Sequence, residues 1–146
     1  MWTEEIRHSH VDGGEGLLAI VFHDNSDYKP GVHFHTAGDA PLQVATMRRQ
    51  VGSAVAPHRH REVRRTVHVQ TQELLIVRAG RVRIDFFTSA GAGMGHSALG
   101  PGDMVLLLRG GHGLQVLEEA EIVEVKQGPY AGTDDKVYFD GSVSET

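Results

Sequence analysis

The chain has 146 residues, of which 40% are hydrophobic and 23% are charged, and this composition predicts one soluble globular domain. No apolar run approaches the ~20 residues of a membrane-spanning helix, and the first ten residues lack a signal-peptide pattern, so we expect a cytoplasmic protein without a membrane partner. The absence of cysteine excludes disulfides and thiolate ligands, so that any metal ion must be held by nitrogen and oxygen atoms.

The net charge of −5 is unevenly distributed. Residues 48–83 contain nine arginines and two glutamates, whereas the rest of the chain is strongly acidic. A basic segment in an acidic protein is compatible with an anionic ligand, but alternation with apolar residues predicts that Arg81 and Arg83 lie on the solvated face of a strand. An acidic chain without an aromatic and basic stripe predicts no nucleic-acid partner.

Eighteen glycines, many short apolar runs and few segments of helical period predict an all-β domain. We expect this single domain to span residues 1–146, with N-terminal strands in 1–41 and a C-terminal wrap in 128–146. Loops are predicted at 37–41 and 89–97. In chain order, the predicted strands are 17–23, 32–36, 42–51, 72–79, 81–88, 104–109, 113–117 and 120–127, with a short strand or wrap at 136–139.

Two of these segments, ELLIV at 73–77 and MVLLL at 104–108, are apolar on both faces. A strand in a single exposed layer alternates apolar and polar residues, so these two need cover on each side. A second sheet or a partner subunit would provide that cover, and we expect a homodimer.

Four residues form the candidate metal site. If the chain is extended at His58 and His60, these side chains point to the same side. Glu73 begins the next predicted strand on the face that carries Leu75, and His112 lies in a glycine-flanked turn. Three neutral imidazoles and a carboxylate suit one divalent transition metal ion (Fe, Mn, Ni, Co, Cu or Zn) rather than calcium.

The spacing of these residues resembles the first motif of the cupin superfamily. Gly52, His58, His60, Glu73 and Gly80 follow the order Gly, five residues, His-x-His, a spacer, Glu, six residues, Gly. The spacer between the second histidine and the glutamate has twelve residues, which is longer than is usual in that family.

The second cupin motif is matched more loosely by Gly102, the segment 108–110 and His112. Leu108 stands where the family has proline, and Gly111 alone separates Gly110 from the histidine. The resemblance covers about residues 52–116 and is closest to small single-domain bacterial cupins. It implies a double-stranded β-helix, or jelly-roll barrel, with His58, His60, Glu73 and His112 as metal ligands.

Other residues leave alternatives open. Glu62 is a second possible carboxylate ligand, although about 13 Å of strand separates it from His58. The insertion 61–72 is expected to form a hairpin that places Arg65 near the barrel mouth. Gln127 shares a face with Val123 and Val125, so it either reaches the pocket or satisfies a local backbone group. The second His-x-His, at 33 and 35, is expected to be structural.

These observations favour a mononuclear metalloenzyme of oxygenase, isomerase or lyase type acting on a small anionic or oxygen-rich metabolite. In that hypothesis Gln127 and Arg65 orient the substrate. The alternatives are a non-catalytic module that binds a small sugar or carboxylate in the same pocket, and an interaction scaffold with a vestigial site.

Overall fold

The structure is a computed structural model that describes residues 1–9, 15–24, 28–62, 64, 70–128 and 136–140. The chain divides into two compact units, unit 1 (Met1–Ser26 and Val69–Thr146) and unit 2 (Asp27–His68), and each is described by itself. The described residues form strands and no helix, which confirms the all-β class. None of them belongs to a helix long and apolar enough to cross a membrane.

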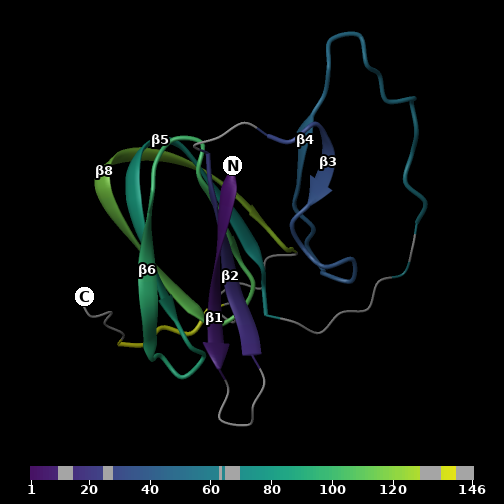
Figure 1. The fold of residues 1–146 in the computed structure, drawn as a ribbon. Helices are drawn as coiled ribbons and strands as arrows, with labels where there is room; N and C mark the ends of the chain where they lie inside the picture. The colour runs from purple at the N-terminus through teal and green to yellow at the C-terminus, as the bar shows by residue number, and fades with distance from the viewer. Residues whose placement is uncertain (10–14, 25–27, 63, 65–69, 129–135, 141–146) are drawn as a thin grey trace. The chain divides into compact units, whose positions relative to one another are not determined.

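Unit 1 contains a six-stranded antiparallel sheet with the order β1-β2-β7-β5-β6, and β8 pairs with β5 as well (Figure 1). Its strands are β1 (Trp2–Ser9), β2 (Glu15–His23), β5 (Glu73–Phe87), β6 (Gly93–Leu99), β7 (Met104–Leu107) and β8 (Gly111–Lys126). In unit 2 the described residues form one hairpin, β3 (Gly31–Phe34) with β4 (Ala45–Arg48).

The sheet of unit 1 is curled into a half-barrel (Figure 1). Although β1 and β6 lie at opposite ends of the strand order, the Ser97 hydroxyl donates a hydrogen bond to Glu4 Oε2 at 3.1 Å. A flat sheet would hold these strands about 19 Å apart, at ~4.8 Å per strand. The curl therefore brings the two ends of the strand order together.

The concave side of the half-barrel carries the main apolar core. Its residues alternate along each strand, as period-two patterning requires: Ala19 and Val21 on β2, Leu75, Val77, Val82, Ile84 and Phe86 on β5, Leu99 on β6, Val105 and Leu107 on β7. The opposite side of β2 and β7 is buried too, because Ile20, Phe22 and Leu106 are at most 2% exposed. The segment MVLLL is therefore buried on both faces in β7, whereas Leu74 and Ile76 of ELLIV are only half-buried on the second face of β5.

The strand β5 differs from the expected pair of strands joined at Ala79-Gly80. It runs unbroken for 15 residues, and its register with β8 shifts around Ala79 and Arg81. Gly80 has φ of +73°, and a Cβ there would clash with the backbone carbonyl of Glu119 on β8. Glycine therefore bends both strands without ending either, and the two strands expected at 113–117 and 120–127 are likewise one, β8.

Two further elements were missed or misassigned from the sequence. Residues 2–9 form β1, which was not anticipated because its charged and apolar residues do not alternate cleanly. Residues 93–97 lie in β6 rather than in a loop, since Gly95 and Ser97 are small inward neighbours of Phe86 and Ile84. Glycines that suggested a turn instead give room for large side chains on the adjoining strand.

Candidate metal centre

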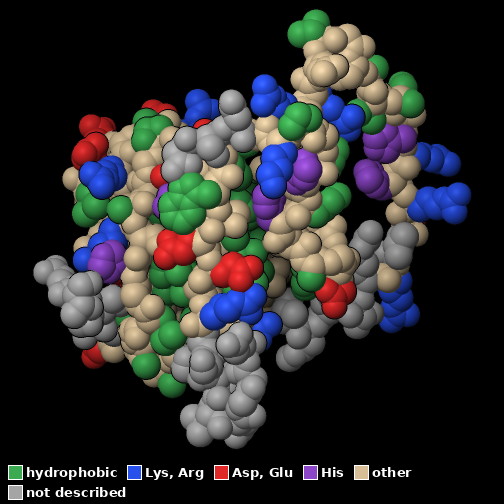
Figure 2. Space-filling model, in the orientation of Figure 1, with side chains coloured by type: hydrophobic (Ala, Val, Ile, Leu, Met, Phe, Trp, Pro, Cys, Tyr) green, Lys and Arg blue, Asp and Glu red, His purple; other side chains and the backbone are tan. Residues whose placement is uncertain are grey.

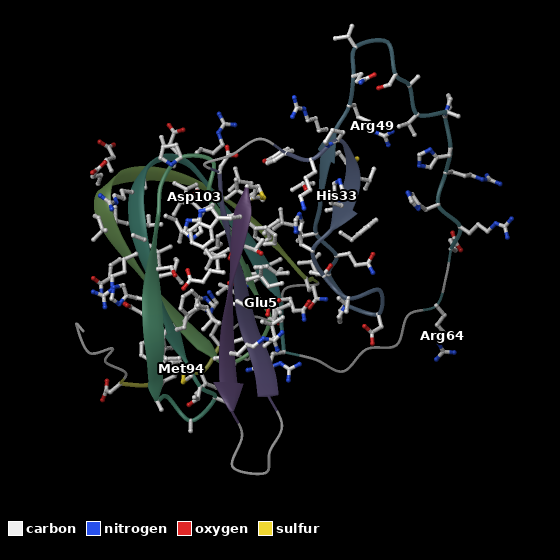
Figure 3. All side chains as sticks on the ribbon, in the orientation of Figure 1. Glu5, His33, Arg49, Arg64, Met94 and Asp103 are labelled. Atoms are coloured by element: carbon white, nitrogen blue, oxygen red, sulfur yellow. The ribbon has the colours of Figure 1, made fainter. Side chains whose placement is uncertain are left out.

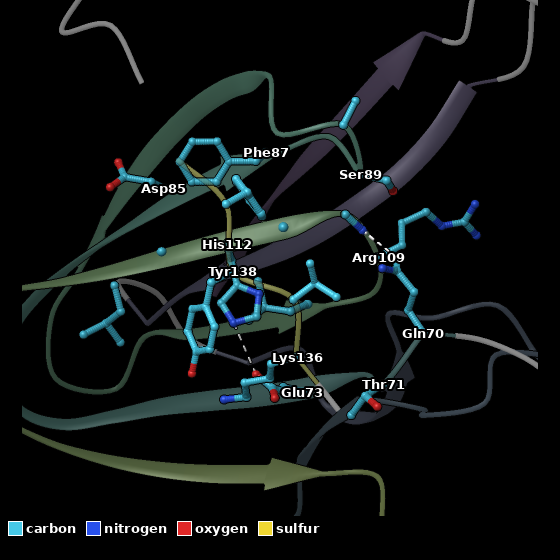
Figure 4. A pocket seen from close by; sticks show the side chains of 18 of the residues that line it. Gln70, Thr71, Glu73, Asp85, Phe87, Ser89, Arg109, His112, Lys136 and Tyr138 are labelled. Carbon is cyan, nitrogen blue, oxygen red and sulfur yellow. Dashed lines mark hydrogen bonds and ion pairs between the residues drawn. The ribbon is translucent and has the colours of Figure 1, made fainter. Parts of the chain in front are cut away.

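Glu73 and His112 meet on the concave side of unit 1, where Glu73 Oε2 lies 3.4 Å from His112 Nε2 (Figure 4). They come from opposite ends of the β5–β8 ribbon, because Glu73 pairs with Lys126 and Phe86 pairs with His112. The curl at Gly80 allows this encounter. The sequence thus predicted correctly that Glu73 begins a strand on the face of Leu75, which is also buried.

The turn before His112 is built from glycine for geometric reasons. Gly110 has φ of +78°, and a Cβ there would clash with the carbonyl of Phe87. Its N–H donates to the side-chain oxygen of Gln70 at 2.8 Å, which fixes the turn. His112 is consequently held as the second residue of β8, in register with Phe86.

The electrostatics of the pair favour a neutral imidazole. Burial lowers the pKa of His112 below its ordinary value, and the ammonium of Lys136 acts in the same direction, while the carboxylate of Glu73 opposes them. Glu73 has a cationic neighbour of its own, because Lys126 Nζ lies 3.8 Å from its Oε1. The side chain of Glu73 is 8% exposed and that of His112 is 36% exposed, so the pair lies at the border between core and solvent.

His58 and His60 belong to unit 2, on a segment without regular strand structure. No strand pairing therefore fixes the direction of their side chains. Their rings are nevertheless neighbours, with centroids 5.4 Å apart and planes at 74°. His58 Nδ1 donates to the carbonyl of Ala56 at 2.9 Å, so Nε2 is the nitrogen of that ring that is available to a ligand.

Arginine side chains neighbour these two histidines on an exposed segment (Figure 2). Glu62, Arg61 and Arg64 are exposed, and Arg64 extends away from the chain (Figure 3). Arg65 and half of the insertion 61–72 lie outside the described residues. No group of three or more His, Asp or Glu residues able to hold a metal is assembled among the residues that the structure describes.

Gln127 bonds to the backbone of Gln72, which is the second of the two roles that its sequence position allowed. Its side-chain oxygen accepts a hydrogen bond from the Gln72 N–H at 3.1 Å, and its own N–H donates to the Gln72 carbonyl at 3.2 Å. The second His-x-His is engaged in the same way within unit 2. His33 Nε2 bonds to the Pro30 carbonyl at 2.9 Å, and His35 Nε2 lies 3.0 Å from the Thr46 hydroxyl.

A pocket of about 850 Å³ opens beside Glu73 and His112 within unit 1. One wall of the pocket is lined by the segment 136–139 (Figure 4), which sequence analysis did not place there. This segment was expected as a short strand or wrap, and in the structure it has no strand pairing. Its Lys-x-Tyr-Phe pattern was the available signal, because a cation and two aromatic rings are unusual in an exposed tail.

No family model, curated protein or solved structure matches the chain. The site is accordingly defined by its own side chains: a buried carboxylate, a neutral imidazole beside it, and a pocket large enough for a small organic molecule.

Proposed function

We propose that this protein is a metal-binding barrel of the cupin type, in which His58, His60, Glu73 and His112 hold one divalent transition metal ion. The observation that carries the proposal is the meeting of Glu73 and His112, which lie at opposite ends of a long ribbon. A double-stranded β-helix is the specific fold proposed, and the curled antiparallel sheet of unit 1 supports it.

The residues present fit such an ion. Two ligand atoms that share a tetrahedral ion at ~2.1 Å are about 3.4 Å apart. The distance from Glu73 Oε2 to His112 Nε2 is 3.4 Å, and the lowered pKa of His112 favours the neutral form that metals require. The hydrogen bond from His58 Nδ1 to Ala56 is the type of contact that orients a histidine for metal binding through Nε2.

A bound ion of this kind would supply a Lewis acid that polarises an oxygen atom of the substrate. The chain itself would hold the ion through these four side chains and exclude part of the solvent through Leu107 and Leu114. Oxygenase, isomerase or lyase action on a small anionic or oxygen-rich metabolite is the enzymatic form of the proposal. The alternative, a non-catalytic binding module, is favoured by Gln127, because its amide is engaged with Gln72 rather than with the pocket.

The test is metal analysis of protein purified without an affinity tag, before and after dialysis against a chelator. We expect about one transition metal ion per chain in wild-type protein and loss of that metal in His60→Ala. His33→Ala is the matched control, because it removes a histidine of the other His-x-His and should retain the metal. Full metal retention by His60→Ala would refute the ligand set.

A homodimer is proposed for a separate reason. Among the described residues β8 pairs only with β5, and it exposes Val116, Leu117, Val123 and Val125 by 43–60%. An exposed apolar edge strand favours pairing with another chain. Light scattering coupled to size-exclusion chromatography should give twice the mass of the chain, and Val123→Lys should reduce it.

A further inference from the structure

Within unit 1, an aromatic side chain of the segment Lys136–Phe139 packs against the strands of the sheet. The Phe139 ring packs edge-on against Phe87, with centroids 5.4 Å apart and planes at 78°. Two glycines make room for it, because a Cβ on Gly111 would clash with the ring and one on Gly91 would lie 3.1 Å from Cδ2. Such a shaped recess gives the segment a defined position on the pocket wall.

This attachment presents Lys136 and Tyr138 beside the pair of Glu73 and His112 (Figure 4). Tyr138 is 89% exposed, so its ring adds little to the stability of the fold. The influence of Lys136 on His112 agrees with this placement, because its positive charge contributes to the lowered pKa of the histidine. A cation and a phenol are thus placed at the pocket without a structural task there.

Both carboxylates that line the pocket have a cationic neighbour that does not line it. Asp85 is neutralised by Arg83, whose Nε lies 2.7 Å from its Oδ1, and Glu73 has Lys126 as a neighbour. By contrast, Lys136 and Arg109 line the pocket and make no ion pair within the described part of the chain. An unpaired ammonium in a partly enclosed pocket attracts an anion.

The same pocket has an apolar wall. Leu107 is the register partner of Glu73 and therefore lies beside it on the concave side. Leu114 follows His112 on that side and is 41% exposed, which is high for a leucine on a concave sheet face. The volume of about 850 Å³ exceeds the needs of an inorganic anion and is typical of a site for a small organic molecule.

We propose that Lys136 and Tyr138 bind the carboxylate of a small organic acid whose apolar body lies on Leu107 and Leu114. The Lys136 ammonium and the Tyr138 hydroxyl donate hydrogen bonds to the carboxylate oxygens. The inference rests on the proposed function only for the location of the site, because binding of the acid by these two groups requires no metal ion.

The experiment measures binding of two fluorinated probes, 4-fluorobenzoate and 4,4-difluorocyclohexanecarboxylate, to chelator-treated protein by ¹⁹F NMR. We expect saturable binding of at least one probe, weakened by salt, and at least about tenfold weaker binding to Lys136→Met, since a charge-assisted hydrogen bond is lost. Tyr138→Phe should weaken binding about threefold. Lys29→Met removes a lysine of unit 2 and should bind like wild type.

Two comparisons separate the parts of the proposal. The neutral analogue 4-fluorobenzamide should bind at least about tenfold more weakly than the benzoate, and acetate should not displace the benzoate at equal concentration. Phe139→Ala should weaken binding as much as Lys136→Met, because it releases the segment from its recess. Val51→Ala is the matched control, because Val51 is fully exposed and is not among the residues that line the pocket, so binding should be unchanged.

Equal binding by Lys136→Met and wild type, or no binding of either acid to wild type, would overturn the assignment. Because the protein is metal-free in this experiment, the result is independent of the metal analysis. Loss of probe binding in Lys136→Met together with absence of metal from wild type would leave the acid site standing and remove the metal centre.

Discussion

Glu73 and His112 lie 3.4 Å apart although the register places them at opposite ends of the β5–β8 ribbon. A straight strand from Glu73 to Phe86, the partner of His112, would span about 43 Å at ~3.3 Å per residue. The ribbon must therefore turn back on itself, and Gly80 marks the place where it does so. The candidate site is a direct consequence of this curvature.

Glu73→Gln tests whether the carboxylate holds a metal ion. The amide has the same size but no charge, and we expect at least about tenfold weaker binding of Co²⁺ or Zn²⁺ by isothermal titration calorimetry. Glu5→Gln is the control, because Glu5 lies on the exposed side of β1 in an ion pair with Arg7. Unchanged affinity in Glu73→Gln would exclude the carboxylate from the ligand set.

The pH dependence of stability tests the environment of His112. Its pKa is lower in the folded protein than the ~6.5 of an unfolded histidine, so the unfolded chain takes up the proton first as the pH falls. The contribution of neutral His112 to the free energy of unfolding is therefore fully present above pH ~6.5. It is lost as the pH falls from there toward the pKa of His112 in the folded protein. Urea unfolding of chelator-treated protein at pH 7.5 and 5.5 should show a larger loss for wild type than for His112→Asn.

An NMR titration of His112 provides the sharper readout of the same environment. Lys136→Met should raise the pKa of His112, because it removes a positive charge that lowers it, whereas Glu73→Gln should lower the pKa further. An unchanged pKa of His112 in both variants would show that these two groups do not face the imidazole.

Gly80→Ala tests the bend of β5. The substitution forces a side chain onto a residue with φ of +73° and against the backbone of Glu119. We expect a loss of at least about 2 kcal/mol in the free energy of unfolding. Gly100→Ala is the control, because a Cβ there meets nothing within 4 Å, and it should change stability by less than about 0.5 kcal/mol. Fluorescence of the single tryptophan, Trp2 on β1, reports unfolding of unit 1.

Alternation of apolar residues was enough to predict the all-β class and the inward face of β5, since Val82, Ile84 and Phe86 are all buried. The pairing of distant strands is not encoded in local alternation, so neither the continuity of β5 and β8 nor the strand β6 could be predicted. Glycine was interpreted as the end of a strand at Gly80 and as part of a loop at 89–97, whereas the break expected in β8 fell at 118–120, which has no glycine. The real use of glycine is to bend a strand or to accommodate a large neighbour, which depends on residues far along the chain.

The candidate site, like the fold, was predictable only in part. Residue types and spacing pointed to Glu73 and His112, and the structure brings these two side chains together. They could be predicted because local sequence shows the face of the strand on which Glu73 lies and the glycine turn that holds His112. Lys136 and Tyr138 escaped notice because a tail has no periodicity to place it. Only the recess formed by Gly91, Gly111 and Phe87 shows where that tail attaches.

Asp85 lines one end of the pocket. Its contribution to the free energy of unfolding can be compared with that of Glu5, which forms an exposed ion pair with Arg7. Arg83 Nε lies 2.7 Å from Asp85 Oδ1, with side chains 16% and 9% exposed, and Gln115 donates to Oδ2 at 3.0 Å. We expect Asp85→Asn to cost about 2 kcal/mol in unfolding free energy, because a charge-assisted hydrogen bond is lost in a buried place.

The ion pair of Glu5 with Arg7 has the same separation, 2.7 Å, but its side chains are 45–46% exposed. Glu5→Gln should therefore cost less than about 0.5 kcal/mol, since solvent screens an exposed pair. A double-mutant cycle of Asp85→Asn with Arg83→Gln should give a coupling free energy of at least about 1 kcal/mol. Equal costs for the two carboxylates would mean that burial does not strengthen the Asp85 contact, and the wall of the pocket would then depend on packing alone.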